Sequence, residues 1–380
     1  MAEGFDKGSI VRYLIGAAQV KFEVLDRCLP AVTSDCDTVI FHLDADAILY
    51  RLYRKRDLSI IYSVPTEVAI KDIVVNLANV VGHYRRYCIT RLRKRCIVYL
   101  YYNDIAPLYQ NTLCPGYRHS WYDMFDERHV EYGPLFKTIS KAMPFVTSIL
   151  QYTTGNYVIE NRGVDNPTAI NYFIRKISDI AKQDHRWASV RHVIVSRSIV
   201  TMQLLNNDIV QLYSKRDKSY VITADTAYAK GVFAAVKSKG PEFLRPPAIP
   251  YLIMLGGFKE LDIEPTTHAH GISRAAVLVG RAIKHEREQY SPELVLNNLA
   301  QVVKNPDQFQ KDREMLTARY NAVRLSSAIY AVTKTIRIRM DGSIVDLYNQ
   351  NALEEINNLL SKINVNGNLL EITNLNLSRT

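Results

Sequence analysis

Two runs of basic residues are the clearest chemical feature of this 380-residue chain. The shorter run covers residues 51–56, and the denser one, residues 84–95, interleaves tyrosines with arginines. Arg and Lys neutralise phosphates without reading base sequence, and tyrosine rings can stack on bases. The runs therefore predict a polyanionic partner, in keeping with a formal net charge of +10. The alternative is a solvated helix end that complements the helix dipole. The candidate binding residues in the denser run are Arg85, Arg86, Arg93, Lys94 and Arg95.

The cysteines and histidines predict neither a disulfide framework nor a metal centre. The five cysteines are odd in number, and none is spaced C-x-x-C. This usage is typical of a reduced, intracellular protein. His268 and His270 flank one residue without a third ligand nearby, which favours a surface loop. No secretory signal opens the chain, and no apolar run reaches the ~18 residues of a membrane span, so no membrane partner is expected.

An α/β framework is expected to position these residues. Continuous apolar runs predict buried strands at residues 38–43, 96–102 and 192–196, with two shorter strands at 208–213 and 220–223. Helices are expected at 47–56, 65–93 and 166–181. Strands alternating with helices imply a mainly parallel sheet covered by helices. The first strand ends in an acidic turn, Asp44-Ala45-Asp46.

A change of composition near residue 240 divides the chain. A helical region is expected to about residue 335, and a hairpin around Asp341-Gly342 and a helix at 351–363 should follow. The predicted domains are an N-terminal extension (1–35), an α/β domain (36–240), a helical region (241–335), and a C-terminal hairpin, helix and tail (336–380).

Seven short stretches, in order, resemble motifs of the flap endonuclease and 5′-3′ exonuclease family. They include FHLDADAILYR from Phe41, the pair YYNDIAPLYQ and CPGYRHSW, and HGISRAA from His270. The other four begin at Gly163, Val193, Leu255 and Leu316. The resemblance implies a PIN-like nuclease fold followed by a duplex-binding helix–three-turn–helix.

Members of that family cleave phosphodiesters with two divalent ions, which need clustered carboxylates. At the matching positions this chain keeps Asp44, has Asp165 in place of Glu, and has Asn103 with Asp104 one step away. Six further ligand positions are neutral: Pro167, Thr168, Ser198, Val200, Phe258 and Leu261. A two-metal site is therefore not expected, whereas a single, weakly held metal at Asp44, Asp104 and Asp165 stays possible; no cofactor is expected unless the protein is an active nuclease. Asp44 could equally cap the following helix.

The resemblance also marks candidate nucleic-acid contacts. Arg118 keeps a positive charge where the motif has Lys, whereas Gln110 and Trp121 replace basic residues. The turn at Gly271 and Ser273 would present backbone N–H groups to a phosphate of duplex DNA. The helix that follows carries Arg274, Arg281 and Lys284.

Three functions remain open on the sequence. The first is a catalytically degenerate 5′-nuclease relative that serves as a nucleic-acid-binding or assembly subunit. Its divergence favours a viral source, with viral or replication proteins as partners and, in that case, association with the virion. The second is an active, divergent Mg²⁺-dependent 5′ nuclease using Asp44, Asp104, Asp165 and one more acid. The third is a protein-interaction scaffold whose positive charge serves an acidic partner.

Overall fold

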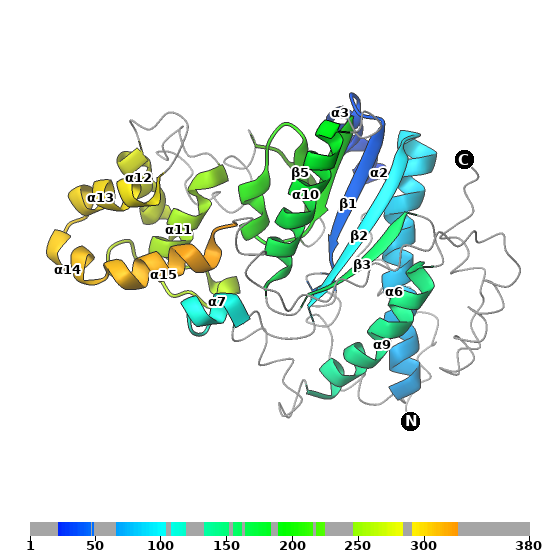
Figure 1. Ribbon diagram of the computed structural model, residues 1–380, viewed down its shortest axis with the longest axis horizontal. Coiled ribbons are helices and arrows are strands. Elements are labelled where there is room, and N and C mark those ends of the chain that lie inside the picture. The colour runs from blue at the N-terminus through cyan, green and yellow to red at the C-terminus, as the bar shows by residue number, and fades with distance from the viewer. Residues whose placement is uncertain are drawn as a thin grey trace, which may run out of the picture.

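A six-stranded sheet forms the centre of the protein in the computed structural model (Figure 1). The structure describes residues 22–46, 48, 66–103, 108–118, 133–151, 155–161, 164–183, 189–215, 218–224, 246–283 and 291–325. The strands are β1 (Thr38–Asp44), β2 (Arg95–Asn103), β3 (Asn156–Asn161), β4 (Val190–Val195), β5 (Ile209–Lys215) and β6 (Lys218–Ile222). Their order is β3-β2-β1-β4-β5-β6, and only β6 runs antiparallel to its neighbour.

Strand β1 lies inside the sheet, between β2 and β4, and all of its residues are buried. Val39, Phe41 and Leu43 pack into one hydrophobic core, and Ile40 packs into another on the opposite face. This alternation is the two-residue period of a strand, and burial on both faces is typical of a parallel sheet.

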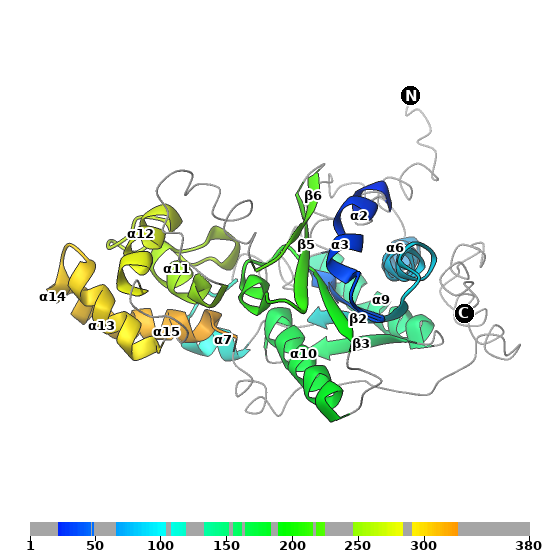
Figure 2. The ribbon, with the colours of Figure 1, turned by 90° about the horizontal axis from the view of Figure 1, so that it is seen from above.

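Helices cover both faces of the sheet (Figure 2). The core that contains Phe41 also contains side chains of α6 (Thr66–Tyr87) and α9 (Gly133–Gln151). The core that contains Ile40 includes α10 (Asn166–Gln183). Two short helices, α2 (Phe22–Cys28) and α3 (Pro30–Thr33), precede β1. One π-helical turn, η1 (Cys88–Leu92), extends α6 towards β2.

A helical region follows the sheet and shares one of its cores. Its helices are α11 (Ile249–Gly256), α12 (Ile272–Ile283), α13 (Pro292–Val302), α14 (Pro306–Lys311) and α15 (Arg313–Val323), with the short turns η4 (Pro246–Ala248) and η5 (Lys259–Leu261). Helices α11 and α12 approach closely at Gly256, where an added Cβ would lie 2.7 Å from the Cα of Ile272. Only glycine fits this contact.

The side chain of Gln203 joins the helical region to the sheet. It lies in η3 (Val200–Leu204), just after β4, and donates to the carbonyl of Val323 at 3.0 Å. Its Oε1 accepts from the N–H of Leu325 at 3.2 Å. The side-chain amide of Gln203 therefore forms hydrogen bonds with two backbone groups at the end of α15. Helix α7 (Leu108–Leu113) also packs on α15.

The predicted fold class is confirmed: the sheet is mainly parallel, helices cover it, and a helical region follows. The five expected strands are present, and strand β3 was missed. The expected helix at 47–56, the hairpin near residue 341 and the helix at 351–363 lie outside the described residues. The domain boundaries stay predictions. No described helix is long and apolar enough to cross a membrane.

Candidate functional site

Polar side chains from four neighbouring strands meet at the carboxyl edge of the sheet. Asp44, Asn103 and Asn161 end β1, β2 and β3, and Ser196 follows β4; all four are buried. The order of the strands reverses between β1 and β4. In open α/β sheets a reversal of this kind leaves a crevice at the carboxyl ends, where ligands bind. This edge is therefore the first candidate site.

Neutral donors hold the carboxylate of Asp44. Asn166, the first residue of α10, donates from Nδ2 to Oδ1 at 2.9 Å, and the Ser196 hydroxyl donates to Oδ2 at 2.9 Å. Asn161 in turn donates to the side-chain oxygen of Asn166 at 2.8 Å. Each carboxylate oxygen thus accepts a hydrogen bond from a side chain that carries no charge. Of the helix that Asp44 would cap, only residues 45, 46 and 48 are described.

A second buried carboxyl, Asp46, lies beside this network and was not a sequence candidate. Its Oδ1 accepts the backbone N–H of Asn103 at 3.2 Å. Burial raises the pKa of Asp46 well above its usual range, and the charge of Asp44 raises it further. Both effects favour the neutral carboxyl. The two-residue spacing Asp44-Ala45-Asp46 was the signal that could have revealed it.

Asp165 caps helix α10. Its Oδ1 accepts the backbone N–H of Thr168 at 3.0 Å and the Thr168 hydroxyl at 2.7 Å. Gln110 Nε2 donates to the same oxygen at 3.3 Å, and the Tyr117 hydroxyl donates to Oδ2 at 2.7 Å. Acceptance of an N–H three residues along is the geometry of an N-cap. Gln110, which replaces a basic residue of the motif, supports this cap.

Arg118 brings a positive charge to the same edge. Its backbone adopts a left-handed conformation (φ 53°), and its N–H donates to the carbonyl of Leu261 at 2.9 Å. Its Nη2 donates to the Ser198 hydroxyl at 3.3 Å, and Cζ lies 5.8 Å from the centre of the Tyr117 ring. The arginine therefore points towards a position where the motif has an acid.

The other neutral positions are built into the core. Val200 and Leu261 are buried apolar residues, and Thr168 and Ser198 are hydrogen-bonded. Across the described residues, no group of three or more His, Cys, Asp or Glu side chains could hold a metal ion. Asp104 lies outside this set. The described donors therefore do not fit the two ions that the family resemblance implies.

A second candidate site is a cavity of about 600 Å³ at the start of α12. Its lining includes Gly271, Ser273 and Arg274 from the predicted turn, together with His270 and Lys304. Arg274 and Lys304 are exposed, and Gly271 (φ 134°) adopts a conformation that favours glycine. The first N–H groups of a helix have no partner inside it and carry a partial positive charge. We call this site the α12 pocket.

His268 fixes the wall of the α12 pocket. Its side chain is 3% exposed, and Nε2 lies 2.9 Å from Oδ2 of Asp312, whose other oxygen accepts from Gln308 at 2.9 Å. Its ring also meets the edge of Phe309. His268 therefore lies in a loop, as expected, but its side chain is buried rather than exposed. Lys304 was missed because it reaches the pocket from the turn between α13 and α14.

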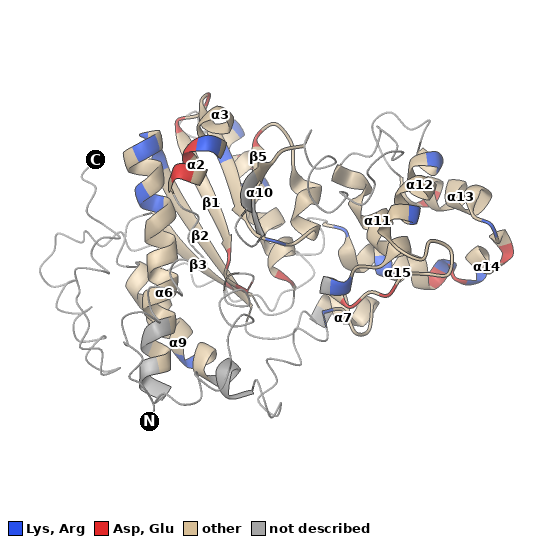
Figure 3. Ribbon diagram, turned by 180° about the vertical axis from the view of Figure 1, so that it is seen from behind, with Lys and Arg blue, Asp and Glu red and all other residues tan. Residues whose placement is uncertain are grey.

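The basic run at residues 84–95 lies at the opposite, amino-terminal edge of the sheet, where Figure 3 shows Lys and Arg at the end of α6. Arg86, Arg93 and Arg95 are exposed, whereas Lys94 and Arg85 are half-buried. Arg85 donates to Asn156 at 3.4 Å. The interleaved rings of Tyr84 and Tyr87 are fully buried, so they are not available to stack on bases.

The remaining predicted contacts are only partly described. Arg281 is exposed on α12, whereas Lys284 and the shorter basic run at residues 51–56 lie outside the described residues. The structure therefore brings Gly271, Ser273 and Arg274 together in one pocket. It leaves Arg118 and the run at 84–95 at separate places.

No family model and no curated protein matches the sequence. Solved structures of bacteriophage T5 proteins are similar to it. A T5 5′-exonuclease with bound zinc is 12% identical, with a TM-score of 0.48 over 86% of this chain and 99% of that one. A T5 flap endonuclease in a pseudo-enzyme–product complex with DNA and metal ions is 12% identical, with a TM-score of 0.49 over the same shares. A further T5 5′-exonuclease mutant is 12% identical, with a TM-score of 0.43 over 86% and 98%.

Proposed function

We propose that this protein is a catalytically degenerate relative of 5′ nucleases that binds the backbone of duplex DNA. The observation that carries the proposal is the state of Asp44. Both of its oxygens accept hydrogen bonds from the neutral side chains of Asn166 and Ser196. Each oxygen of this carboxylate thus already accepts a hydrogen bond from an uncharged donor.

The chemistry of the carboxyl edge supports binding rather than cleavage. Two-metal hydrolysis uses carboxylates that bridge ions and so clamp the attacking and leaving oxygens. Here Asn166 and Ser196 point N–H and O–H groups at Asp44, and Asp165 caps α10.

The α12 pocket supplies the contact with DNA in this proposal. The start of α12 offers backbone N–H groups to a phosphate, and Arg274 and Lys304 add two exposed cations on either side. Such contacts fix a duplex in position without reading its sequence. The turn corresponds to the helix–three-turn–helix that the sequence resemblance implies.

The role that follows is that of a replication accessory or a structural subunit. A subunit without nuclease chemistry would deliver or hold DNA for other viral or replication proteins. Because binding through phosphates is electrostatic, its affinity should fall steeply with salt.

Two measurements test the proposal. Purified protein should not cleave flap, nicked or single-stranded DNA with Mg²⁺ or Mn²⁺; cleavage that disappears in Asp44→Ala would overturn the degenerate reading in favour of an active nuclease. The protein should bind labelled duplex at low salt. The Arg274→Glu/Lys304→Glu variant should bind duplexes of every sequence more weakly, and to the same degree. It should also reduce the slope of log K against log salt by about 1.8. Absence of duplex binding at low salt would overturn the proposal and leave the protein-interaction scaffold as the remaining candidate function.

A further inference from the structure

Four arginines surround the turn between α6 and β2. Arg86 lies on the last turn of α6, Arg91 on η1, Arg93 after it, and Arg95 begins β2. All four are exposed. We call them the amino-edge arginine cluster, and Figure 3 shows the concentration of basic residues at this end of α6.

The backbone of this turn is held in one shape. The N–H groups of Arg93 and Lys94 both point to the carbonyl of Cys88, the latter at 3.3 Å. Arg93 adopts a left-handed conformation with φ 57°, and Arg95 N–H donates to the carbonyl of Asp37 at 3.1 Å. A turn fixed in this way presents its arginines without an ordering cost for the backbone.

The guanidinium groups of Arg91, Arg93 and Arg95 are available to a partner. Arg91, Arg93 and Arg95 form no ion pair with another described residue. An exposed guanidinium forms two parallel hydrogen bonds with one phosphate, which a lysine cannot do.

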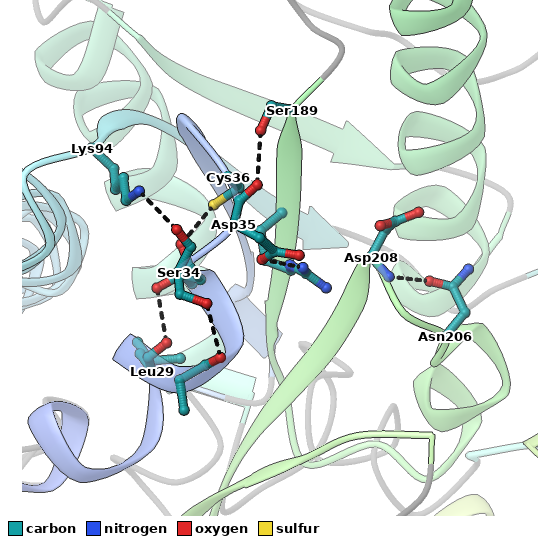
Figure 4. Close-up of polar contacts among 11 residues, drawn as sticks. Leu29, Ser34, Asp35, Cys36, Lys94, Ser189, Asn206 and Asp208 are labelled. Atoms are coloured by element: carbon teal, nitrogen blue, oxygen red, sulfur yellow. Dashed lines mark hydrogen bonds and ion pairs between the residues drawn. The ribbon is translucent and has the colours of Figure 1, made fainter.

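Acidic residues border the cluster but do not neutralise it. Asp35 is paired with Arg191 at 2.7 Å, and Figure 4 shows Asp35 beside Ser34 and Lys94. Asp37 is exposed next to Arg95, and Glu23 and Asp26 are exposed on α2. These acids limit the surface that a polyanion can cover, so its contact should centre on the turn itself.

The composition of the surface selects the kind of partner. A protein interface usually has an apolar centre, but the exposed large hydrophobic residues of the described chain are elsewhere: Ile180, Leu294 and Met315. Single-stranded nucleic acid needs exposed rings for stacking, and Tyr84 and Tyr87 are fully buried. The phosphate backbone of a duplex needs neither feature.

The cluster is also separate from the α12 pocket. It lies at the amino-terminal edge of the sheet, and the nine residues of β2 place the carboxyl edge about 26 Å away. The helical region joins the sheet through η3, which follows β4. In Figure 1, α12 and the end of α6 lie towards opposite ends of the molecule.

We infer that the amino-edge arginine cluster is a second duplex-binding surface, so that one protein molecule holds two duplex segments at once. The inference goes beyond the proposed function, which needs only the α12 pocket. The bound chemistry is the same at both places, a sugar-phosphate backbone read without sequence preference.

A two-colour capture experiment tests this inference. A short duplex is fixed to a surface and saturated with protein, and a second duplex with a different label is then added at low salt. The wild type should capture the second duplex. The Arg91→Glu/Arg95→Glu variant should capture about tenfold less, because two phosphate contacts become repulsive. Its binding to the first duplex should remain.

The matched control is Lys141→Glu/Lys176→Glu, which changes the net charge equally at exposed positions of α9 and α10. Circular dichroism melts establish that all variants fold. Equal loss of capture in the control, or strict one-to-one binding by the wild type, would overturn the inference while leaving the proposed function intact.

A further variant, Arg274→Glu/Lys304→Glu, isolates the cluster from the pocket. It should still bind one duplex at low salt. If it binds a polyglutamate chain but no duplex, the cluster serves an acidic protein and the inference is wrong.

Discussion

Arg118 and Ser198 are joined by a hydrogen bond of 3.3 Å between Nη2 and Oγ at the carboxyl edge of the sheet. The charge of Arg118 lowers the pKa of Asp46, against the larger effects of burial and of Asp44. A guanidinium therefore supplies positive charge beside buried carboxyls. A cation in this position offsets part of the cost of burying Asp46 in its charged form.

Replacing Arg118 with Met should destabilise the protein. The substitution keeps much of the side-chain volume but removes the donor to Ser198 and the charge beside Asp46. We expect the free energy of unfolding to fall by about 1–3 kcal/mol at neutral pH. Urea unfolding measures it, with Arg118→Lys as the control that keeps the charge. An unchanged unfolding midpoint in Arg118→Met would show that the arginine does not stabilise this site.

Chelation should leave stability unchanged. A ligand that binds only the folded state raises the melting temperature, so a resident divalent ion would be detected as a shift. Because Asp44 and Asp165 are engaged by neutral donors, melts in millimolar Mg²⁺, Mn²⁺ or EDTA should coincide. A Mg²⁺-dependent rise that Asp44→Asn abolishes would contradict this expectation.

Acid should weaken the fold through two buried histidines. His42 contacts the Tyr101 hydroxyl at 2.8 Å and His192 at 3.0 Å through its two ring nitrogens. Burial lowers the pKa of His42 well below its usual value and lowers the pKa of His192 to about 4, to which nearby Arg191 contributes. Both histidines are thus neutral in the folded protein, and the unfolded chain binds their protons more readily.

The folded protein should therefore become less stable as the pH falls. The contribution of the two neutral histidines to the free energy of unfolding is complete above pH ~6.5. It is lost as the pH falls towards the folded-state pKa, by about 1.4 kcal/mol per pH unit for each histidine. Urea unfolding at pH 7 and pH 5 measures the loss, and a His192→Gln variant should lose less between the two. The raised pKa of Asp46 makes its own contribution to stability increase as the pH falls. This contribution is the same in the wild type and in His192→Gln, so it cancels when the two are compared. Equal losses would exclude the histidines as the cause.

Gly271→Ala should weaken duplex binding. At φ 134° an L side chain is strained, and the turn at the α12 pocket should shift. Gly116→Ala is the matched control, since Gly116 also has a positive φ (88°) and open space around its Cβ position. Both variants should lose similar stability, but only Gly271→Ala should lose affinity in a duplex titration. If Gly271→Ala and Gly116→Ala bound the duplex equally well, the α12 pocket would have no part in duplex binding.

The central strands could be predicted because each is a continuous apolar run. Strand β3 could not, since it pairs with β2 alone and its sequence, NYVIEN, is polar at both ends. Tyr84 and Tyr87 lie on the buried face of α6, which continues to Cys88 at the start of η1, and the many charged residues between them made this helical period hard to recognise.

The sites depended on contacts between distant residues. Asp44 was found because it follows a strand, but its partners Asn166 and Ser196 lie more than a hundred residues away. The burial of the His268 side chain was not foreseen because its partner Asp312, between α14 and α15, is 44 residues away. Neither pairing leaves a local pattern in the chain.

The amide of Gln203 has a mechanical consequence. Its two hydrogen bonds to backbone groups hold the end of α15 to the turn after β4, and a shared core continues from α10 into α11 and α12. Tension on a duplex at the α12 pocket would therefore pass into the central strands rather than be absorbed by a hinge at this junction. If a duplex binds at the α12 pocket as proposed, these contacts at the junction limit how far it can swing relative to the sheet.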